Sequence, residues 1–213
     1  MKVTVFGATS ALGRHVVDDL SFRGHDVVAQ ADGPAELPEC WRGTVDVVAG
    51  DLADPGTVDT AVARGEAVVN ALGPDRDGVP TRLDLPECTR RILESMRGHD
   101  VRRYVGLGTC RVLDPEEHLS VPERVQQLAT LSAHPRGHRE MTEVMRTVMA
   151  SDVEWTLVRY LVSREGEPRG IKRVGLYGKD HIGASVTRAD VAHFIAAQVL
   201  DRDYIGVAPA VSN

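Results

Sequence analysis

The stretch VFGATSALGRHVV, residues 5–17, has the spacing that most directly suggests binding chemistry. A run of apolar residues breaks at Gly7, and apolar residues resume with helical spacing around Gly13. A strand-to-helix turn of this kind presents backbone N–H groups and a helix N-terminus to a phosphate. Thr9 and Ser10 are small, and each hydroxyl can donate to a phosphate oxygen. The stretch predicts a diphosphate-binding turn; the alternative is a tight turn with no ligand.

An acidic residue follows the second apolar run. Asp32 lies 19 residues after Gly13, where a carboxylate can accept hydrogen bonds from the adenosine ribose of a nicotinamide dinucleotide. A 2′-phosphate at that position would meet Asp32, and Glu36 adds a second negative charge. We therefore predict that NAD(H) is favoured over NADP(H). The ordinary alternative is a solvated loop aspartate.

The elements that must position these residues alternate along the chain. Helical patterns such as residues 11–24, 55–65 and 89–100 separate short Val-rich runs. The runs predicted as buried strands are residues 2–6, 25–30, 44–50, 66–72, 102–108 and 154–159. Repeated strand-then-helix units with buried β-branched strands indicate an α/β fold. The prediction is a doubly wound, Rossmann-type parallel sheet with helices on both faces, in a single domain spanning residues 1–213.

Two irregular stretches follow strand ends. They cover residues 111–136 and 162–184, and both would border the crevice at the carboxyl edge of an open α/β sheet. With their flanking residues they predict a substrate pocket formed by 109–137 and 160–185.

Composition excludes several classes of protein. The chain has 213 residues, 42% of them hydrophobic, and a formal net charge of −6, which argues against nucleic acid as the main partner. No stretch approaches the roughly 20 apolar residues of a membrane helix, so no membrane association is expected. Three cysteines at unrelated spacings predict neither disulfides nor a zinc site, and favour a reducing cytoplasm. The acidic run DPEEH, residues 114–118, is expected to be solvated, and no metal site is predicted.

Several segments together resemble a known group. They are residues 5–17, VVAGDLADPGTVDTAVARGEAVVNALGP (47–74), VRRYVGLGT (101–109), SDVEWTLVR (151–159) and VTRADVAHFIAAQVLDRDYIG (186–206). They are similar to the atypical short-chain dehydrogenase/reductases with an NAD(P)-binding, NmrA-like fold, and most similar to the flavin reductase/biliverdin-IXβ reductase type. The resemblance covers nearly the full length, and it is more specific for dinucleotide binding than for a reaction.

The resemblance implies a role for each matching residue. The pyrophosphate is expected to contact Gly7, Thr9, Ser10, Leu12 and Gly13. Adenine is expected beside Asp51 and Leu52. The ribose and nicotinamide are expected beside Ala71, Leu72 and Gly73. Thr109 matches an active-site Ser or Thr. Arg159, between Val158 and Tyr160, matches a segment that passes the nicotinamide amide.

The chain also departs from the family pattern. Asp32 stands where arginine is usual, which puts an NADPH preference in doubt, and Ser10 replaces the middle glycine. Tyr160 replaces a proline and places an aromatic hydroxyl near the expected pocket. The Tyr-x-x-x-Lys pair of the wider superfamily is absent, because Pro135 and Arg139 occupy those positions. Ordinary alcohol dehydrogenase chemistry is therefore not expected.

The remaining chemistry is hydride transfer to an acceptor that needs little acid catalysis. A flavin, quinone, tetrapyrrole or enone spreads the incoming charge, so the protein must mainly position it and exclude water. Thr109 is the candidate for orienting nicotinamide or substrate, and the catalytic candidates are Thr109, His138 and Tyr160. His134 and Tyr177 are further candidate proton donors; His138 ranks first because histidine titrates nearest neutral pH. Cys110 is expected to be a packed residue.

We thus predict an NAD(P)H-dependent oxidoreductase that acts on a small conjugated or aromatic molecule, as a monomer or homodimer. Two alternatives stay open at this point. One is a cofactor-retaining isomerase, epimerase or cyclase without net redox. The other is an NmrA-like regulatory protein that senses dinucleotides.

Overall fold

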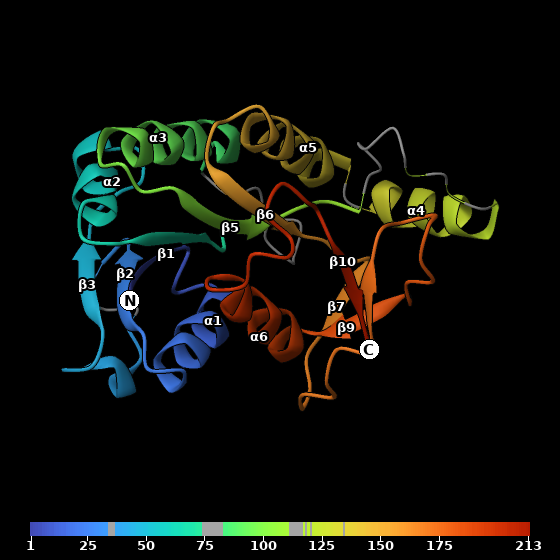
Figure 1. The fold of residues 1–213 in the computed structure, drawn as a ribbon, viewed down its shortest axis with the longest axis horizontal. Helices are drawn as coiled ribbons and strands as arrows, with labels where there is room; N and C mark the ends of the chain where they lie inside the picture. Colours follow the sequence, from blue (N-terminus) through green and yellow to red (C-terminus); the bar gives the residue numbers. More distant parts are fainter. Residues whose placement is uncertain (34–36, 74–82, 111–116, 118, 120, 134) are drawn as a thin grey trace.

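A six-stranded parallel sheet forms the centre of the molecule (Figure 1). The computed structural model describes residues 1–33, 37–73, 83–110, 117, 119, 121–133 and 135–213. In spatial order the strands are β3 (Asp46–Ala49), β2 (Asp26–Ala31), β1 (Lys2–Phe6), β4 (Ala67–Asn70), β5 (Arg103–Leu107) and β6 (Glu154–Val158). The inner strands are rich in valine and buried, as expected when helices cover both faces. The predicted doubly wound parallel sheet is confirmed.

Helices cover the two faces of this sheet unequally. One face carries α1 (Ala11–Phe22) and α6 (Arg188–Gln198); the other carries α2 (Pro55–Val62), α3 (Leu85–Gly98) and α5 (Pro135–Met149) (Figure 1). The short 3₁₀ turn η2 (Glu39–Trp41) buries Trp41, whose indole N–H donates to Asp18 of α1 at 3.0 Å. Among the described residues, no helix is both long enough and apolar enough to cross a membrane.

The strand order creates a switch point beside β1. The chain builds outward from β1 to β3 and then returns to add β4, β5 and β6 on the other side of β1. Phe6 of β1 is in register with Asn70 of β4, and Asn70 with Gly106 of β5. The carboxyl ends of these strands therefore meet at one edge, where open α/β sheets bind ligands. The loops after β1, β2, β4 and β5 all leave from this edge.

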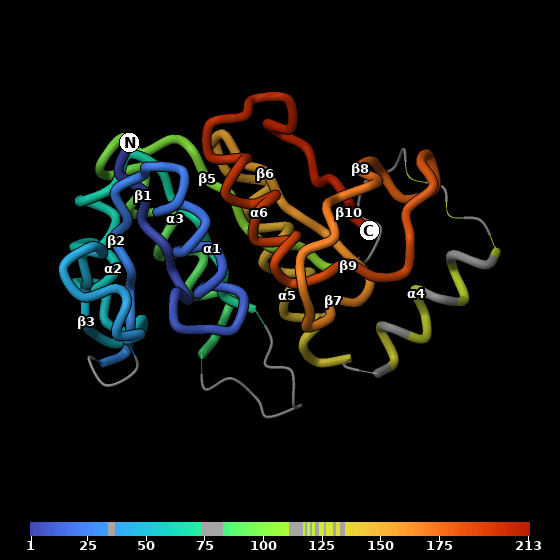
Figure 2. Tube along the Cα trace, turned by 90° about the horizontal axis from the view of Figure 1, so that it is seen from below, coloured from blue at the N-terminus to red at the C-terminus, as the bar shows by residue number. Residues whose placement is uncertain are grey.

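The C-terminal part of the chain adds two small sheets beyond β6 (Figure 2). In the first, β7 (Val162–Arg164) pairs in parallel with β9 (Ser185–Thr187); in the second, β8 (Arg173–Gly175) pairs antiparallel with β10 (Ala210–Ser212). Asp190 at the start of α6 accepts hydrogen bonds from the N–H groups of Arg169 and Gly170, and so holds the β7–β8 connection. The stretch 162–184 thus contains two short strands.

The other stretch predicted to be irregular is largely helical. Residues 121–133 form α4 (Val121–Ala133), and α5 begins at Pro135, so the expectation of irregular structure across 111–136 is wrong for this part. Pro122 and Pro135 fall in first turns, where a helix has no N–H group to lose. Prolines therefore mark helix starts here rather than breaks.

A buried arginine ties α6 to the sheet. Arg103 at the start of β5 donates to the Gln198 carbonyl at 3.1 Å, the Glu154 carbonyl at 2.7 Å and the Thr156 hydroxyl at 2.8 Å. Burial lowers the pKa of Arg103 to about 10, so it remains protonated at neutral pH. Its charge faces the carbonyl end of α6, which a cation stabilises.

The tightest backbone contact lies where α1 meets the turn after β1. A Cβ atom on Gly13 would lie 2.0 Å from the Gly7 carbonyl oxygen and 2.9 Å from the Cα of Ala8. No side chain fits in that space, so α1 can begin this close to β1 only because residue 13 is glycine.

Substituting Gly13 by alanine is expected to reduce the free energy of unfolding by about 1–3 kcal/mol, because the added methyl group overpacks this contact. Urea denaturation measures the change. Gly98→Ala is the matched control: Gly98 ends α3, and a Cβ there would meet nothing within 4 Å. That variant should be as stable as the wild type or slightly more stable. Equal effects of the two substitutions would contradict the packing argument.

Candidate functional site

The turn after β1 is built to leave backbone donors exposed. The Ser10 N–H donates to the Gly7 carbonyl at 3.0 Å, and Ser10 caps α1 by accepting from the Gly13 N–H, also at 3.0 Å. The N–H groups of Ala11 and Leu12 lie in the first helical turn, where a helix offers no carbonyl to accept them. The positive end of the α1 dipole adds to their attraction for an anion. Ser10 accepts through a lone pair, so its own hydroxyl hydrogen can still donate.

Gly7 connects this turn to the neighbouring one. It adopts a φ of +71°, and a Cβ there would lie 3.0 Å from backbone atoms of Ala71 and Leu72. The turns after β1 and β4 are therefore in contact, as a shared cofactor crevice requires. The Leu12 side chain is buried, so Leu12 would contribute only backbone groups to a ligand site. The Thr9 carbonyl already accepts a hydrogen bond from Arg14. These residues fit the predicted diphosphate site.

Asp32 directly follows β2 and is exposed. Because β2 lies next to β1, its carboxylate leaves the sheet from the same edge as the Gly7 turn. Glu36, the second negative charge expected here, lies outside the described residues. Asp32 thus lies at the edge of the sheet where the ribose interaction is predicted, and that interaction stays a prediction.

The predicted adenine-flanking pair shapes the turn before α2. The Asp51 carboxylate accepts from the Ala53 N–H at 2.7 Å, and Leu52 is buried. Arg91 of α3 donates to the carbonyls of Leu52 and Ala53 and so fixes this turn to α3. Adenine at this position would contact the backbone of the turn and the exposed Asp51, since the Leu52 side chain packs into the core.

A buried polar network supports the turn at 71–73. The Ala71 N–H donates to the Phe6 carbonyl at 2.9 Å, and the Leu72 N–H donates to the Asn70 side-chain oxygen at 3.1 Å. The Asn70 amide nitrogen in turn donates to the Tyr104 hydroxyl at 3.0 Å. Burial raises the pKa of Tyr104 well above its ordinary value, so this phenol stays neutral. Asn70 and Tyr104 are not among the residues predicted from the sequence, although a polar residue that ends an apolar strand is a usable signal.

Thr109 and His138 form the polar pair of the site. The Thr109 hydroxyl lies 2.9 Å from Nδ1 of His138, and the Thr109 N–H contacts the Met145 sulfur at 3.2 Å. Thr109 follows β5 and is 3% exposed, whereas His138 lies in the first turns of α5. Residues that are 29 positions apart thus meet at the carboxyl edge of the sheet.

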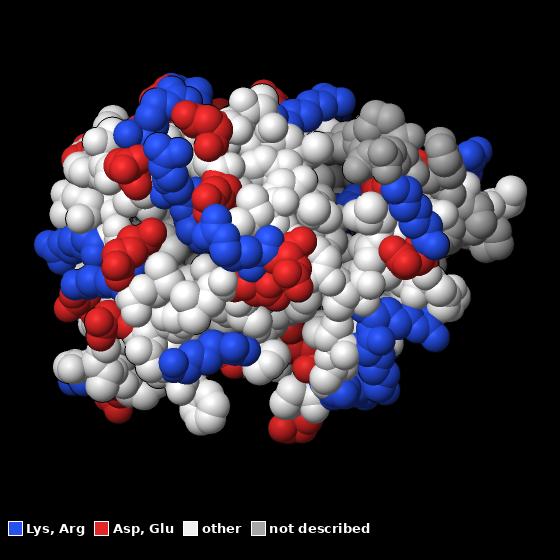
Figure 3. Space-filling model, viewed as in Figure 1, with Lys and Arg blue, Asp and Glu red and all other residues white. Residues whose placement is uncertain are grey.

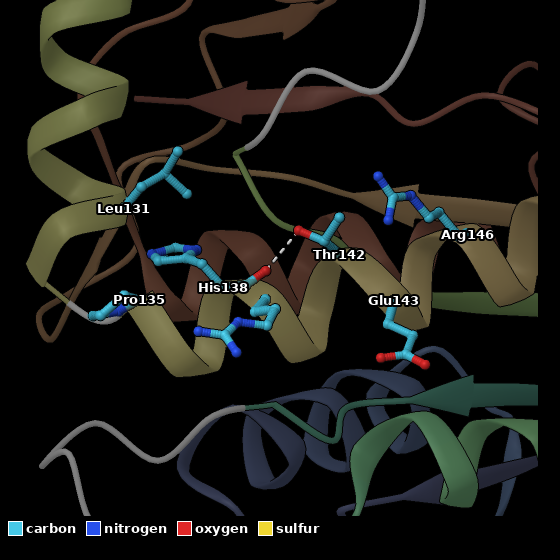
Figure 4. A pocket seen from close by; sticks show the side chains of 7 residues that line it. Leu131, Pro135, His138, Thr142, Glu143 and Arg146 are labelled. Carbon is cyan, nitrogen blue, oxygen red and sulfur yellow. Dashed lines mark hydrogen bonds between the residues drawn. The ribbon is translucent and has the colours of Figure 1, made fainter.

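His138 of this pair lines a cavity of about 710 Å³, formed mainly by α5 with Leu131 of α4 (Figure 4). Its lining residues are Leu131, Pro135, His138, Arg139, Thr142, Glu143 and Arg146. Pro135 and Arg139, which occupy the Tyr and Lys positions of the wider superfamily, both line it. The predicted pocket included 109–137 and 160–185; among the described residues, the second range contributes none of the lining, and α5 contributes most.

The other catalytic candidates lie elsewhere or outside the described residues. Tyr160 is half-buried and packs against the core cluster around β1 and α6. His134 lies outside the described residues. Tyr177 is buried, and burial raises its pKa well above the ordinary value, which disfavours proton donation. Cys110 is buried in the same apolar cluster as Tyr177, consistent with a packing role.

Arg159 does not direct its side chain toward a cofactor. Its guanidinium, 1% exposed, pairs with the Glu117 carboxylate through both terminal nitrogens, one of them at 2.9 Å, and its Nε donates to the Ala208 carbonyl at 2.7 Å. The Tyr177 ring lies 5.0 Å from the guanidinium carbon. All these groups belong to the fold, so the expectation of a cofactor contact from this side chain is not supported.

Glu117 corrects a second expectation. It belongs to the run DPEEH that was expected to be solvated, yet its carboxylate is buried against Arg159 and also accepts from the Tyr177 N–H at 3.1 Å. Residues 114–116 and 118 lie outside the described residues. Within the described part of the chain, no three His, Cys, Asp or Glu residues are grouped so that they could hold a metal ion.

Comparison with known proteins agrees with this geometry. The sequence pattern of a family described as NAD(P)H-binding matches residues 7–202, from the first glycine of the turn to the end of α6. The chain belongs to this NAD(P)H-binding family.

This chain covers only part of the length of the curated relatives that it matches. A 3-diazoavenalumate denitrifying reductase from a Streptomyces species is 32% identical over 176 residues, which are 75% of this chain and 55% of that protein. An uncharacterized protein of Mycobacterium tuberculosis is 25% identical over 177 residues, 76% of this chain and 20% of the relative. The chain thus spans between a fifth and just over half of the curated relatives it matches.

Solved structures of similar fold include oxidoreductases. A short-chain dehydrogenase/reductase from Veillonella parvula in complex with NADP superposes with a TM-score of 0.79 at 16% identity, covering 100% of this chain and 94% of the other. ChuY, an anaerobillin reductase from Escherichia coli O157:H7, also gives 0.79 at 16% identity, covering 100% and 97%. At this identity the likeness shows the NAD(P)H-binding family's fold and nothing further.

Glu117→Gln is expected to reduce the free energy of unfolding by about 3–5 kcal/mol, because it leaves the buried Arg159 charge without its carboxylate. Chemical denaturation followed by circular dichroism measures this. Asp152→Asn is the control, since the Asp152–Arg97 pair is exposed and should contribute less than about 1 kcal/mol. A loss for Glu117→Gln no larger than for the control would show that the pair does not stabilise the fold.

Proposed function

We propose that this protein is an NAD(P)H-dependent reductase of the NmrA-like, atypical short-chain type that transfers a hydride to a small conjugated or aromatic acceptor. The observation that carries the proposal is the contact between Thr109 and His138 at the carboxyl edge of the sheet, together with the cavity of about 710 Å³ that His138 lines. This volume lies in the range of small-molecule sites. Family membership supports the cofactor half of the proposal.

In this proposal, one set of residues holds the cofactor and another orients the acceptor. A bound nicotinamide cofactor supplies the hydride. The first turn of α1 would hold its diphosphate, Asp32 its adenosine ribose, and the turn 71–73 its nicotinamide ribose. The Thr109 hydroxyl, held in place by His138, would donate a hydrogen bond to the acceptor. His138 would pass a proton to the reduced product or leave that step to solvent.

The acceptor class follows from what lines the cavity. Where the wider superfamily carries a tyrosine and a lysine, this cavity has Pro135 and Arg139, so it lacks the phenol that protonates a developing alkoxide. Acceptors that delocalise charge do not need that acid. The diazo compound named for the Streptomyces reductase also belongs to the electron-accepting, conjugated class, which supports this choice.

Oxidation of the reduced cofactor in the presence of flavin or quinone tests the proposal, and loss of the hydroxyl at position 109 should slow it. Thr109→Val is expected to reduce kcat at least 10-fold, whereas Thr109→Ser, which keeps the hydroxyl, should retain most of the rate. Stopped-flow absorbance at 340 nm measures both. Tight cofactor binding without turnover of any acceptor would favour the regulatory alternative, and interconversion without net oxidation would favour an isomerase.

We also propose that NADH is preferred over NADPH, because the exposed carboxylate of Asp32 would repel a 2′-phosphate. The expected wild-type preference in dissociation constant is on the order of 10-fold or more. Asp32→Ser should reduce it to about 3-fold or less. Asp26→Ser, at the opposite end of the same strand, should leave it unchanged. Isothermal titration with both nucleotides measures all three proteins, and tighter binding of NADPH to the wild type would reject this part of the proposal.

A further inference from the structure

The cavity that His138 lines is formed mainly by one side of α5. His138, Arg139, Thr142, Glu143 and Arg146 recur at intervals of three or four residues, which places them on the same side of the helix. Met141 and Met145, which lie between them, and Val148, which follows Arg146, are buried against the sheet and α3. The cavity wall is therefore a largely polar, charged stripe next to the buried, apolar side of α5.

Two arginines of this stripe, Arg139 and Arg146, differ from the other arginines of α3 and α5 in their ion pairing. The described part of α3 and α5 contains six arginines, and four of them form ion pairs: Arg90 and Arg91 with Glu87, Arg97 with Asp152, and Arg136 with Glu140. Acidic and basic side chains accordingly lie side by side over α3 in Figure 3. Arg139 and Arg146 form no ion pair with any residue that the structure describes.

Glu143 does not neutralise them. It lies four residues after Arg139, which is the weaker order for a helical ion pair, and three residues before Arg146. Among the described residues it forms an ion pair with neither arginine. Figure 4 shows the side chains of Glu143 and Arg146 pointing away from each other. With His138 engaged by Thr109, the cavity presents two guanidinium groups against one carboxylate.

We infer that the acceptor held in this cavity carries an anionic group, a carboxylate or a phosphate, that is bound by Arg139. The inference rests on the proposed function for the identity of the ligand as an acceptor. A guanidinium matches the two oxygens of either anion in a forked hydrogen bond. Arg139 and His138 both line the cavity, so a ligand whose anionic group is bound by Arg139 shares the cavity with the imidazole that contacts Thr109.

Arg146 has a supporting role. It lies seven residues beyond Arg139, about 10 Å along the helix, too far for a small ligand to touch both arginines and Thr109. Its charge raises the positive potential along the cavity. The cofactor's own phosphates belong elsewhere: the turn that would hold them follows β1, which is two strands and about 10 Å from β5.

Two pairs of flavins test the inference, with the members of each pair differing in the anionic group. FMN is compared with riboflavin for a phosphate, and carboxymethylflavin with lumiflavin for a carboxylate. Quenching of flavin fluorescence on the full chain, in the presence of NAD⁺, gives dissociation constants without any turnover. The anionic member of at least one pair should bind about 10-fold more tightly, and that preference should fall with added salt.

Arg139→Gln should lower the preference to about 1–3-fold, and Arg146→Gln should lower it less. Arg136→Gln is the control: Arg136 lies on the same helix, is paired with Glu140 and does not line the cavity, so the preference should persist. Equal binding of neutral and anionic members, or no saturable binding by any of the four, overturns the inference. So does an Arg139→Gln variant that keeps the preference but binds NADH more weakly, because Arg139 would then hold the cofactor.

The flavin-binding measurement distinguishes a failure of this inference from a failure of the proposed function. Arg139-dependent selection of anionic flavins without NADH oxidation would support the inference and reject the reductase. Reduction of both members of each pair with equal affinity would support the reductase and reject the inference.

Discussion

The site depends on a missing methyl group. Because residue 13 is glycine, α1 can begin close to the turn after β1. A Cβ atom at position 13 would lie only 2.0 Å from the carbonyl oxygen of Gly7. That contact sets the position of the first helical turn, and with it the backbone donors aimed at the crevice. Gly7 extends the constraint to the turn after β4. Any residue with a side chain at position 13 would move α1 away from the sheet and withdraw its N-terminus from the anion that the family binds.

Around this contact, the protein uses buried ionic and polar groups to fasten loops. Arg159 and Glu117 join the segment after β5 to the one after β6, and Asn70 joins the turn at 71–73 to Tyr104 on β5. Each buried group has hydrogen-bond partners, which buried polar atoms require. The described turns that border the crevice are therefore held by internal partners, so a ligand meets turns that are already shaped. Such pre-organisation lowers the cost of binding.

The candidate catalytic pair shows how the same fold can carry different chemistry. The sheet delivers Thr109 to the edge beside β4, and α5 delivers His138 to it. The cavity that His138 lines is charged along α5, and its described lining contains no tyrosine.

Sequence patterns alone determined the six strands and the glycine turn, because buried strands and tight turns depend on local residue types. They also singled out Thr109 and His138, though not their contact. Only the tertiary structure decided what the long-range partners are. Glu117 looked like part of a solvated acidic run and Arg159 like a cofactor contact, yet they neutralise one another 42 residues apart. The residues 121–133, which looked irregular, form a helix. A charged side chain has the same local pattern whether water, a ligand or a distant counter-ion surrounds it, so only the folded chain distinguishes these cases.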